Sequence, residues 1–599
     1  MKPNFFSRIT SAFVSPILRE LPFFLAFILL IGTDTFRAIH SQIVKPDPNV
    51  GVLNLVGQFS FVVMMAYIFT VIVASVGKRW LKIVFYVVIV ALFTISTFLF
   101  QNFGMTIKPY NLTLLLESNG REASEFVQMF VLSKGSIATY CILSFVIAAI
   151  VLAESAYRKK VGSRPQLDFE YNLPVAIAML CLLGLGLYAS TSFIRLLRCE
   201  TPDDYYLFSK NDAVTLSDPI SRITQSSYAL HLASREMKTA VESTRQMDRN
   251  VSLESTDSIN VVLVIGESFN KWHSNLYGYP LNTMPKLSRE AAEGRLTVFD
   301  DAVCNFALTS PSMKNMLCCN SIADGESWSQ SPYFPALFKA AGFQVFLWDN
   351  QKDVDPSSFF SFALNSFLYN DEILDRSYTA VNEHSYPYDY SLIENFKKTA
   401  ARSTHNLMVF HLLGQHYDAK GRYPKVPQFM HFTADSIHRT EPYLTDKMRE
   451  DIAHYDNATL YNDHVVNSII DLFKDQNTVL VYLSDHGEEI YDYNASRARD
   501  YTGLNDNWMK YIHEVPFFIW CSDKYAATHP TTIEAVRRAA HQPFTTDNLC
   551  QLMFDLGQLR TSYYKADRDP LSTQFKPRKR VVEGMEDQMR GDFDEIRKR

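Results

Sequence analysis

The hydrophobic residues follow two different patterns along the chain. Up to about residue 200 they form long runs, whereas after residue 257 they come in short runs that alternate with stretches of helical spacing. The long runs approach the roughly 20 apolar residues that a membrane-spanning helix needs. Short runs that alternate with helices are typical of a mostly parallel sheet with helices on both faces. The sequence therefore predicts an N-terminal five-helix transmembrane domain over residues 1–200 and an α/β domain over residues 258–575.

Five apolar runs are the candidate membrane spans. The first is the weakest, because Thr33, Asp34 and Thr35 interrupt it. A cleaved signal peptide is the alternative for this run, but no small-x-small cleavage site follows it cleanly, so we favour an uncleaved span. The runs are about Leu21 to Phe36, Leu53 to Val76, Trp80 to Phe103, Ile137 to Ala153 and Leu173 to Ile194.

The basic residues between these runs predict the orientation, because Lys and Arg of short loops stay on the cytoplasmic side. Ten of them lie before the first run, between the second and third, and between the fourth and fifth, whereas the alternate loops hold five. The N-terminus is therefore expected inside, and everything after Ile194 outside.

Three polar segments complete the organisation. A long outer loop, about Gly104 to Gly135, carries Ser118 and Glu122, and a plain solvated loop is the alternative to a functional one. Residues 201–257 form a juxtamembrane connecting segment with helical spacing from Ser217 to Met247. Residues 576–599 form a charged tail, which we expect to be a solvated helix or disordered.

Charge and cysteine content narrow the function classes. With 599 residues and a formal net charge of −6, the chain offers no electrostatic case for a nucleic-acid partner. The eight cysteines form no Cys-x-x-Cys pair. Cys304, Cys318 and Cys319 flank one short segment, so a disulfide and free buried thiols both stay open there.

Six short apolar runs are the candidate strands, and two of them end in residues that bind metals. Glu267 follows one run after Gly266, and Asp485 and His486 follow another after Ser484. If these runs are neighbouring parallel strands, the three side chains meet at the carboxyl edge of the sheet. One His and two carboxylates suit zinc, whereas a core strand ending in a capped turn is the alternative for each run. The runs are Asn260 to Ile265, Leu296 to Phe299, Gln344 to Trp348, Leu407 to Leu413, Val479 to Leu483 and Val515 to Trp520.

A hydroxyl pair marks another candidate site. After an apolar run, the chain reads Thr309-Ser310-Pro311 and then continues with helical spacing. A hydroxyl at a helix N-terminus lies where an anion or phosphate is favoured. A simple N-cap, Thr or Ser followed by Pro, is the alternative.

Taken together, the motifs resemble a known group of enzymes. Gly-Glu267-Ser, Thr309-Ser-Pro, Gly414-Gln415-His416 and Ser-Asp485-His486-Gly-Glu follow apolar runs in the order seen in the alkaline phosphatase superfamily. Residues 258–570 resemble the sulfatase-like catalytic domain of the phosphoethanolamine transferases that modify lipid A and lipopolysaccharide core. The membrane half is similar too, with five spans and a long outer loop that contains Glu122-Ala123.

The resemblance implies a set of roles. Glu267, Thr309, Asp485 and His486 would hold Zn²⁺, with Thr309 as the nucleophile; one ion is expected and the total number stays open. His416 would act on the substrate as general acid or base or meet a second zinc, and His513 is a weaker match because Glu514 separates it from Val-Pro. The remaining substrate-binding candidates are Asn350, Lys352, Ser118 and Glu122.

The resemblance also implies the reaction and the compartment. Phosphoethanolamine would pass from phosphatidylethanolamine to Thr309 and then to lipopolysaccharide, either lipid A or core, at the periplasmic face of a bacterial inner membrane. A phosphoglycerol transferase making a surface polymer is the main alternative. A sulfatase fits less well because Thr309 cannot yield formylglycine and Met313 stands where Arg is expected. A non-catalytic membrane protein is the alternative from another class.

Overall fold

The computed structural model divides the chain into two compact units, Met1–Leu232 and Ala233–Arg599. We refer to them as the membrane unit and the catalytic unit, after the domains that the sequence predicts in them. The structure describes residues 13–44, 51–103, 106–107, 131–132, 136–161, 173–202, 204–205, 208, 216–255, 257–352, 367–399, 403–416, 419–495, 497–498, 506–583 and 590–598.

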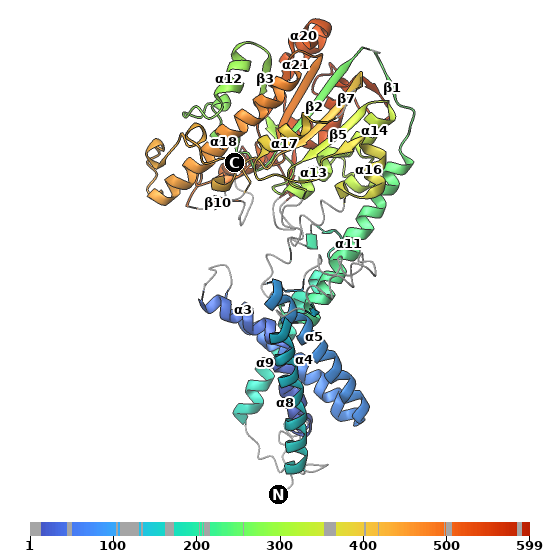
Figure 1. Cartoon of the computed structure of the whole chain (residues 1–599), viewed down its shortest axis with the longest axis vertical. Helices are drawn as coiled ribbons and strands as arrows, with labels where there is room; N and C mark the ends of the chain where they lie inside the picture. The colour runs from blue at the N-terminus through green and yellow to red at the C-terminus, as the bar shows by residue number, and fades with distance from the viewer. Residues whose placement is uncertain are drawn as a thin grey trace. The chain divides into compact units, whose positions relative to one another are not determined.

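Helices, most of them apolar, make up most of the described part of the membrane unit (Figure 1). Four of them are long and apolar enough to cross a membrane, or up to five if the bent pair Phe13–Arg19 and Leu21–Ile31 forms one span. The helices are α2 (Leu21–Ile31), α3 (Thr33–Val44), α4 (Val52–Val76), α5 (Arg79–Phe103), α8 (Ile137–Val161) and α9 (Leu173–Leu196).

The first expected span is not one continuous helix. Helix α2 ends at Ile31, Gly32 follows, and α3 begins at Thr33. Asp34 is buried at the start of α3, where one carboxylate oxygen accepts from Arg37 at 2.7 Å and the other accepts from Ser96. A polar residue that is bonded inside the unit explains why the apolar run breaks at this point.

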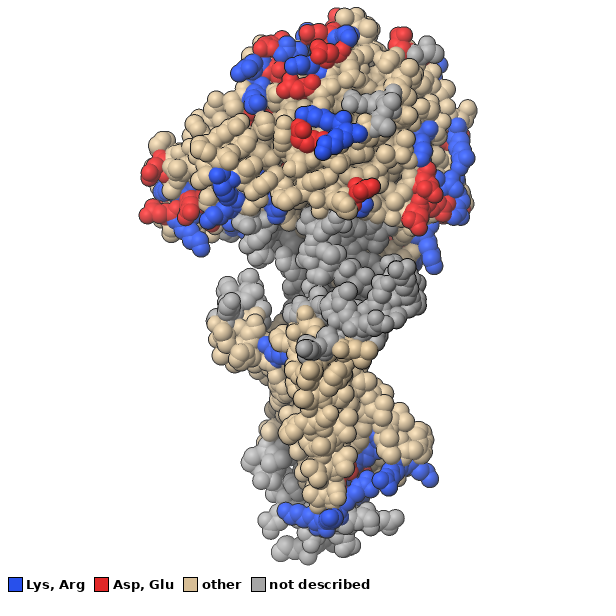
Figure 2. Space-filling view, viewed as in Figure 1, with Lys and Arg blue, Asp and Glu red and all other residues tan. Residues whose placement is uncertain are grey.

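Basic side chains gather at one end of the membrane unit, as Figure 2 shows. Lys82 pairs with Glu154, and this contact brings the start of α5 to the end of α8. The exposed basic residues at or next to these two helix ends are Lys78, Arg79, Arg158, Lys159 and Lys160. Charge asymmetry of this kind is what sets the orientation of membrane helices.

The predicted helix between the two halves is confirmed as α11 (Pro219–Gln246). Beyond it, β1 (Ser252–Leu253) pairs antiparallel with β13 (Leu559–Arg560). The last residues of the expected connecting segment therefore pair with a strand of the catalytic unit.

A seven-stranded sheet organises the catalytic unit, in the order β3-β11-β8-β2-β7-β5-β6. All six predicted runs are strands of this sheet, and β2 and β8 are parallel neighbours. The sheet is mixed, because β11 runs antiparallel to both β3 and β8. The strands are β2 (Ile259–Gly266), β3 (Leu296–Phe299), β5 (Gln344–Asp349), β6 (Ala380–Val381), β7 (His405–His411), β8 (Thr478–Ser484) and β11 (Phe517–Cys521).

Both faces of the sheet are buried under helices (Figure 1). Alternate residues of β2 point to opposite faces: Val261 and Leu263 join one apolar cluster, whereas Val262 and Val264 join the other. The first cluster is shared with α13 (Thr309–Leu317), α14 (Phe334–Ala340) and α22 (Leu549–Leu556). The second is shared with α12 (Pro285–Ala292), α17 (Asp389–Phe396) and α18 (Asp446–Phe473). The other helices are α16 (Asp371–Ser377), α19 (Asp506–His513), α20 (Asp523–Thr528) and α21 (Pro530–Ala539).

The prediction of a solvated or disordered C-terminal tail is wrong for its described residues. Strands β14 (Val581–Glu583) and β15 (Arg590–Asp592) form an antiparallel pair, and α23 (Phe593–Ile596) follows. Val582 and Phe593 are buried against Val303. Asn305 Nδ2 donates to the Val581 carbonyl at 2.7 Å, and the Glu583 amide donates to the Asn305 carbonyl at 2.8 Å. The tail thus holds the segment that leads to Thr309.

Short strands complete the catalytic unit. Strand β4 (Ala302–Val303) pairs in parallel with β12 (Phe544–Thr545). Strand β9 (Glu489–Ile490) pairs antiparallel with β10 (Arg497–Ala498). All eight cysteines are free, so the three in question, Cys304, Cys318 and Cys319, are buried thiols here.

Candidate active site

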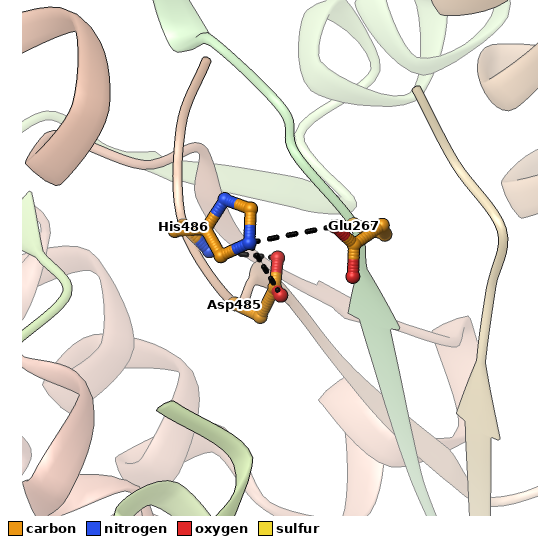
Figure 3. Close-up of side chains that lie close together, drawn as sticks. All are labelled: Glu267, Asp485 and His486. Atoms are coloured by element: carbon orange, nitrogen blue, oxygen red, sulfur yellow. Dashed lines mark hydrogen bonds and ion pairs between the residues drawn. The ribbon is translucent and has the colours of Figure 1, made fainter. Parts of the chain in front are cut away.

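Strands β2 and β8 end side by side and bring three metal-binding side chains together (Figure 3). Glu267, Asp485 and His486 are each 0% exposed, and one ligand atom from each lies within 4.8 Å of the others. His486 Nε2 is 3.4 Å from Glu267 Oε1 and 3.1 Å from Asp485 Oδ2. The convergence predicted from the two strand ends is confirmed.

The turns after the two strands fix these side chains. The amides of Ser268 and His486 both donate to Asp485 Oδ1, at 3.1 and 2.7 Å. His486 Nδ1 lies 2.9 Å from the Gly487 carbonyl. A carbonyl oxygen only accepts hydrogen bonds, so Nδ1 carries a proton and Nε2 is the ring nitrogen that faces the two carboxylates. His486 is therefore oriented as a metal ligand is.

The charge of this group favours a bound cation. Burial and the charge of Glu267 raise the pKa of Asp485 well above its usual range. Two buried carboxylates cannot both ionise at low cost without a compensating positive charge. One imidazole nitrogen and two carboxylates form the donor set that zinc accepts, with a position left for a further ligand. The residues present therefore fit a zinc ion.

Thr309 provides a hydroxyl at this group. Its Oγ1 donates to Glu267 Oε2 at 3.1 Å and lies 3.2 Å from His486 Nε2. Thr309 is the first residue of α13, and Leu308 occupies the N-cap position without a side-chain cap. The hydroxyl of Thr309 thus faces the metal-binding side chains instead of capping the helix. Ser310 Oγ is buried, with no hydrogen-bond partner among the described residues.

Gln351 contacts the same carboxylate, and the sequence analysis did not select it. Its Nε2 donates to Glu267 Oε2 at 3.0 Å and to the Leu412 carbonyl at 2.8 Å. The sequence does contain a pattern that includes Gln351, because this residue lies in the polar run after β5 that also holds the substrate-binding candidates Asn350 and Lys352. A run of three polar residues after a strand does not reveal which side chain faces the site.

The two neighbours of Gln351 have other contacts. Asn350 is fully buried, and its amide donates to Asp389 Oδ1 at 2.8 Å and accepts from the Tyr386 amide at 2.6 Å. Both the nitrogen and the oxygen of the Asn350 side-chain amide are hydrogen-bonded to other protein groups. In this geometry Asn350 therefore has a structural role. Lys352 Nζ donates to the Asn382 carbonyl at 3.2 Å. The expected substrate role of Lys352 stays a prediction.

The turn that carries His416 passes beside Glu267. Gly414 has a φ of 49°, and a Cβ there would lie 2.7 Å from the Glu267 carbonyl, so only glycine fits. Asp389 accepts from the Leu413 and Gly414 amides at 2.8 and 3.0 Å and holds the turn. His416 itself is half-buried, and its Nδ1 lies 3.5 Å from Arg422.

His513 is buried behind the segment that precedes Thr309. Its Nδ1 donates to the Cys304 carbonyl at 3.0 Å, and burial lowers its pKa to about 4. His513 is therefore neutral at pH 7, with a buried Nε2 that has no hydrogen-bond partner among the described residues. The predicted Ser118 and Glu122 lie outside the described residues.

Comparison with known proteins places this site in a family. The sulfatase family model matches residues 259–558, which contain every side chain of the metal-binding group. The chain belongs to the sulfatase family. The resemblance to phosphoethanolamine transferases of the alkaline phosphatase superfamily is confirmed by relatives with that name.

Two relatives show how far the similarity of this sulfatase-family chain extends. Phosphoethanolamine transferase EptC of Escherichia coli RS218 is 30% identical over 54% of this chain and 55% of its own length. The chain thus spans about half the length of that relative. Phosphoethanolamine transferase CptA of Salmonella typhimurium LT2 is 27% identical over 80% of each chain.

A solved structure also resembles the catalytic half. The C-terminal periplasmic domain of EptC from Escherichia coli has a TM-score of 0.49 and 28% identity, and the match covers 58% of this chain and 95% of that one.

Proposed function

We propose that the protein transfers phosphoethanolamine from phosphatidylethanolamine to lipopolysaccharide. The observation that carries this proposal is the position of Thr309 Oγ1, 3.1 Å from Glu267 Oε2 and 3.2 Å from His486 Nε2. A nucleophile hydroxyl beside three metal-binding side chains is the arrangement that phosphoryl transfer through a covalent intermediate requires. Relatives named phosphoethanolamine transferases support the choice of the transferred group.

Glu267, Asp485 and His486 would hold a zinc ion, with Thr309 as the fourth donor. When bound, zinc lowers the pKa of a hydroxyl beside it and so supplies a nucleophile at neutral pH. The protein's own part is to aim Thr309 Oγ1. Helix α13 begins at this residue, and the buried contacts of Asn305 to the tail fix the approach to it.

The proposed reaction has two steps, each of which forms one bond to phosphorus and breaks another. Thr309 Oγ forms a bond to phosphorus while the bond from phosphorus to the glycerol oxygen breaks, and diacylglycerol leaves with a proton. An acceptor oxygen of lipopolysaccharide next attacks phosphorus, and Thr309 Oγ leaves and regains a proton. His416, half-buried on the turn beside Glu267, is the proposed general acid or base.

The proposed topology follows from the distribution of charge. Five spans within residues 1–200 and a cytoplasmic N-terminus would put the catalytic domain, residues 258–575, in the periplasm, with residues 201–257 as the connection. The grouped basic side chains of the membrane unit support this orientation. An inner-membrane protein in this orientation reaches both lipid substrates, because tethering raises their effective concentration at the site.

Trapping the intermediate tests the proposal. The full-length protein is incubated with phosphatidylethanolamine, and its intact mass and peptide map are measured. We expect a phosphoethanolamine adduct on Thr309, no adduct and no turnover in Thr309→Ala, and some turnover in Thr309→Ser, which keeps a hydroxyl. Ser310→Ala is the matched control and should keep both adduct and turnover.

The same experiment separates the alternatives. A phosphoglycerol adduct from phosphatidylglycerol would identify a phosphoglycerol transferase. An adduct on Ser310, or full activity in Thr309→Ala, would overturn the assignment of the nucleophile. The acceptor, lipid A or core, is then identified by mass spectrometry of lipopolysaccharide from cells with and without the protein.

A further inference from the structure

A second group of polar side chains lies directly behind the Glu267 carboxylate. His411 ends β7, where it is the register partner of Ile265 on β2 and of Asp349 on β5. His411 and Asp349 are 0% and 1% exposed, and His411 Nδ1 lies 2.9 Å from Asp349 Oδ1. Gln351 connects this pair to Glu267, because its Nε2 is 3.0 Å from both His411 Nε2 and Glu267 Oε2.

The contacts of Gln351 define which way its amide points. Its Nε2 lies within 3.0 Å of Glu267 Oε2, the Leu412 carbonyl and His411 Nε2. A carboxylate and a carbonyl accept only, so the nitrogen of the amide must face them. The reversed amide would set its oxygen against two other oxygens. The two oxygen acceptors therefore determine the orientation of the side-chain amide.

The pair behind Gln351 keeps it in place. Asp349 Oδ1 accepts from His411 Nδ1 at 2.9 Å and also from the backbone amide of Gln351 at 2.7 Å. Its other oxygen accepts from the Tyr369 hydroxyl at 2.7 Å. His411 Nε2 lies 3.0 Å from Gln351 Nε2, whose two hydrogens are directed at Glu267 Oε2 and the Leu412 carbonyl, so Asp349 supports Gln351 through the backbone amide. His411 thus holds Asp349, Asp349 holds the backbone of Gln351, and the side chain of Gln351 holds Glu267.

The two oxygens of Glu267 have different surroundings. Oε1 accepts from Ser268 Oγ at 2.6 Å and is the oxygen that faces His486 at 3.4 Å. Oε2 accepts from Gln351 and from Thr309 Oγ1. Gln351 therefore fixes the rotation of the carboxylate about its last bond. That rotation decides whether Oε1 points at the metal-binding centre.

We propose that Gln351 is a positioning residue that orients Glu267 for metal binding, with Asp349 and His411 as its support. This inference rests on the metal site of the proposed function and is independent of the substrate. Outer residues that bond to metal ligands change metal affinity by about 10- to 100-fold when they are replaced. Gln351 contacts Glu267 alone among the three ligands in the hydrogen bonds of the described residues, so its effect should fall on that ligand.

Zinc affinity tests the proposal directly. The full-length protein in detergent is stripped of metal, and its dissociation constant for zinc is measured by competition with a chromophoric chelator. Gln351→Met, which keeps the length of the side chain and loses the donor, should bind zinc about 10- to 100-fold more weakly. Gln542→Met, at a half-buried glutamine on the loop between α21 and β12, is the matched control and should bind like the wild type.

Two further measurements separate positioning from a loss of folding. The metal-free Gln351→Met protein should keep the melting temperature of the metal-free wild type. The Co²⁺-substituted variant should show a shifted visible absorption, because the ligand geometry around the ion has changed. Wild-type zinc affinity and an unchanged cobalt spectrum in Gln351→Met would overturn the inference. No zinc binding by the wild type would instead overturn the metal site itself.

Discussion

His273 offers a sharp test of how buried charge stabilises the catalytic unit. Its side chain is 0% exposed, and its two ring nitrogens face two different carboxylates. Nδ1 lies 2.7 Å from Asp456 Oδ1, and Nε2 lies 3.2 Å from Asp492 Oδ1. Burial alone would lower the pKa of His273, but the charges of Asp492 and Asp456 outweigh it and raise the pKa to about 10. His273 is therefore an imidazolium ion in the folded protein.

The sign of the pH dependence follows from this shift. The folded-state pKa of about 10 lies above the ordinary value of 6.5, so protonation favours the folded state. The contribution of His273 to the free energy of unfolding is complete below pH 6.5 and disappears as the pH rises to about 10. At about 1.4 kcal/mol for each pKa unit, the shift has an upper limit of about 5 kcal/mol.

We predict that His273→Gln lowers the free energy of unfolding by about 3 kcal/mol at pH 6, at the lower end of the cost of breaking a buried ion pair. The cost is below the upper limit because both carboxylates keep other partners. Asp456 still accepts from the Tyr279 hydroxyl at 2.9 Å, and Asp492 still accepts from Arg439 at 3.0 Å. Glutamine is neutral, so the difference between wild type and variant should shrink steadily as the pH rises from 6.5 towards 10.

Tryptophan fluorescence during denaturant unfolding measures this difference. Five of the six tryptophans lie in the catalytic unit, so the signal reports on that unit. His384→Gln is the matched control, because the side chain of His384 is 77% exposed. Equal stability of His273→Gln and wild type at pH 6, or a difference that stays constant up to pH 10, would refute the argument.

Two further predictions concern the helix that carries Thr309 and the metal. Lys314 on α13 is 1% exposed and donates to Glu236 at 3.3 Å. Lys314→Met should therefore lower the free energy of unfolding by about 2 kcal/mol. This is less than the cost of breaking a fully buried pair, because Glu236 is 14% exposed. Adding Glu236→Gln should recover most of that loss in the same fluorescence assay, and a double variant no more stable than Lys314→Met would contradict this account. Removal of zinc should lower the melting temperature of the catalytic unit. Free zinc at 100 times its dissociation constant would raise the free energy of unfolding by about 2.7 kcal/mol. Asp485→Asn should bind little zinc and show no such response, and a zinc-dependent melting temperature in this variant would argue against the assigned ligands.

The sheet and its ligands could be predicted because they depend on local patterns. Buried strands read as short apolar runs, and polar residues directly after them must lie at the edge of the sheet. Glu267, Asp485 and His486 were therefore identifiable without knowledge of the fold. The direction of β11 could not be predicted in the same way, because an apolar run is the same in a parallel and an antiparallel strand.

The parts that sequence missed depend on contacts between distant segments. Gln351 and Asn350 are adjacent and equally polar, yet only the fold decides that one faces Glu267 and the other faces Asp389. The tail carries few apolar residues, so no periodicity reveals its burial. Its order comes from Val303 and Asn305, which lie far away in the chain.

The contact between the tail and the segment before Thr309 sets an order of events during synthesis. Asn305 is made 276 residues before Val581, to whose carbonyl it donates. A growing chain therefore contains Thr309 and all three candidate metal ligands well before β14 has left the ribosome. The bonds of Asn305 to the tail are thus among the last contacts of the segment before Thr309 to form during synthesis.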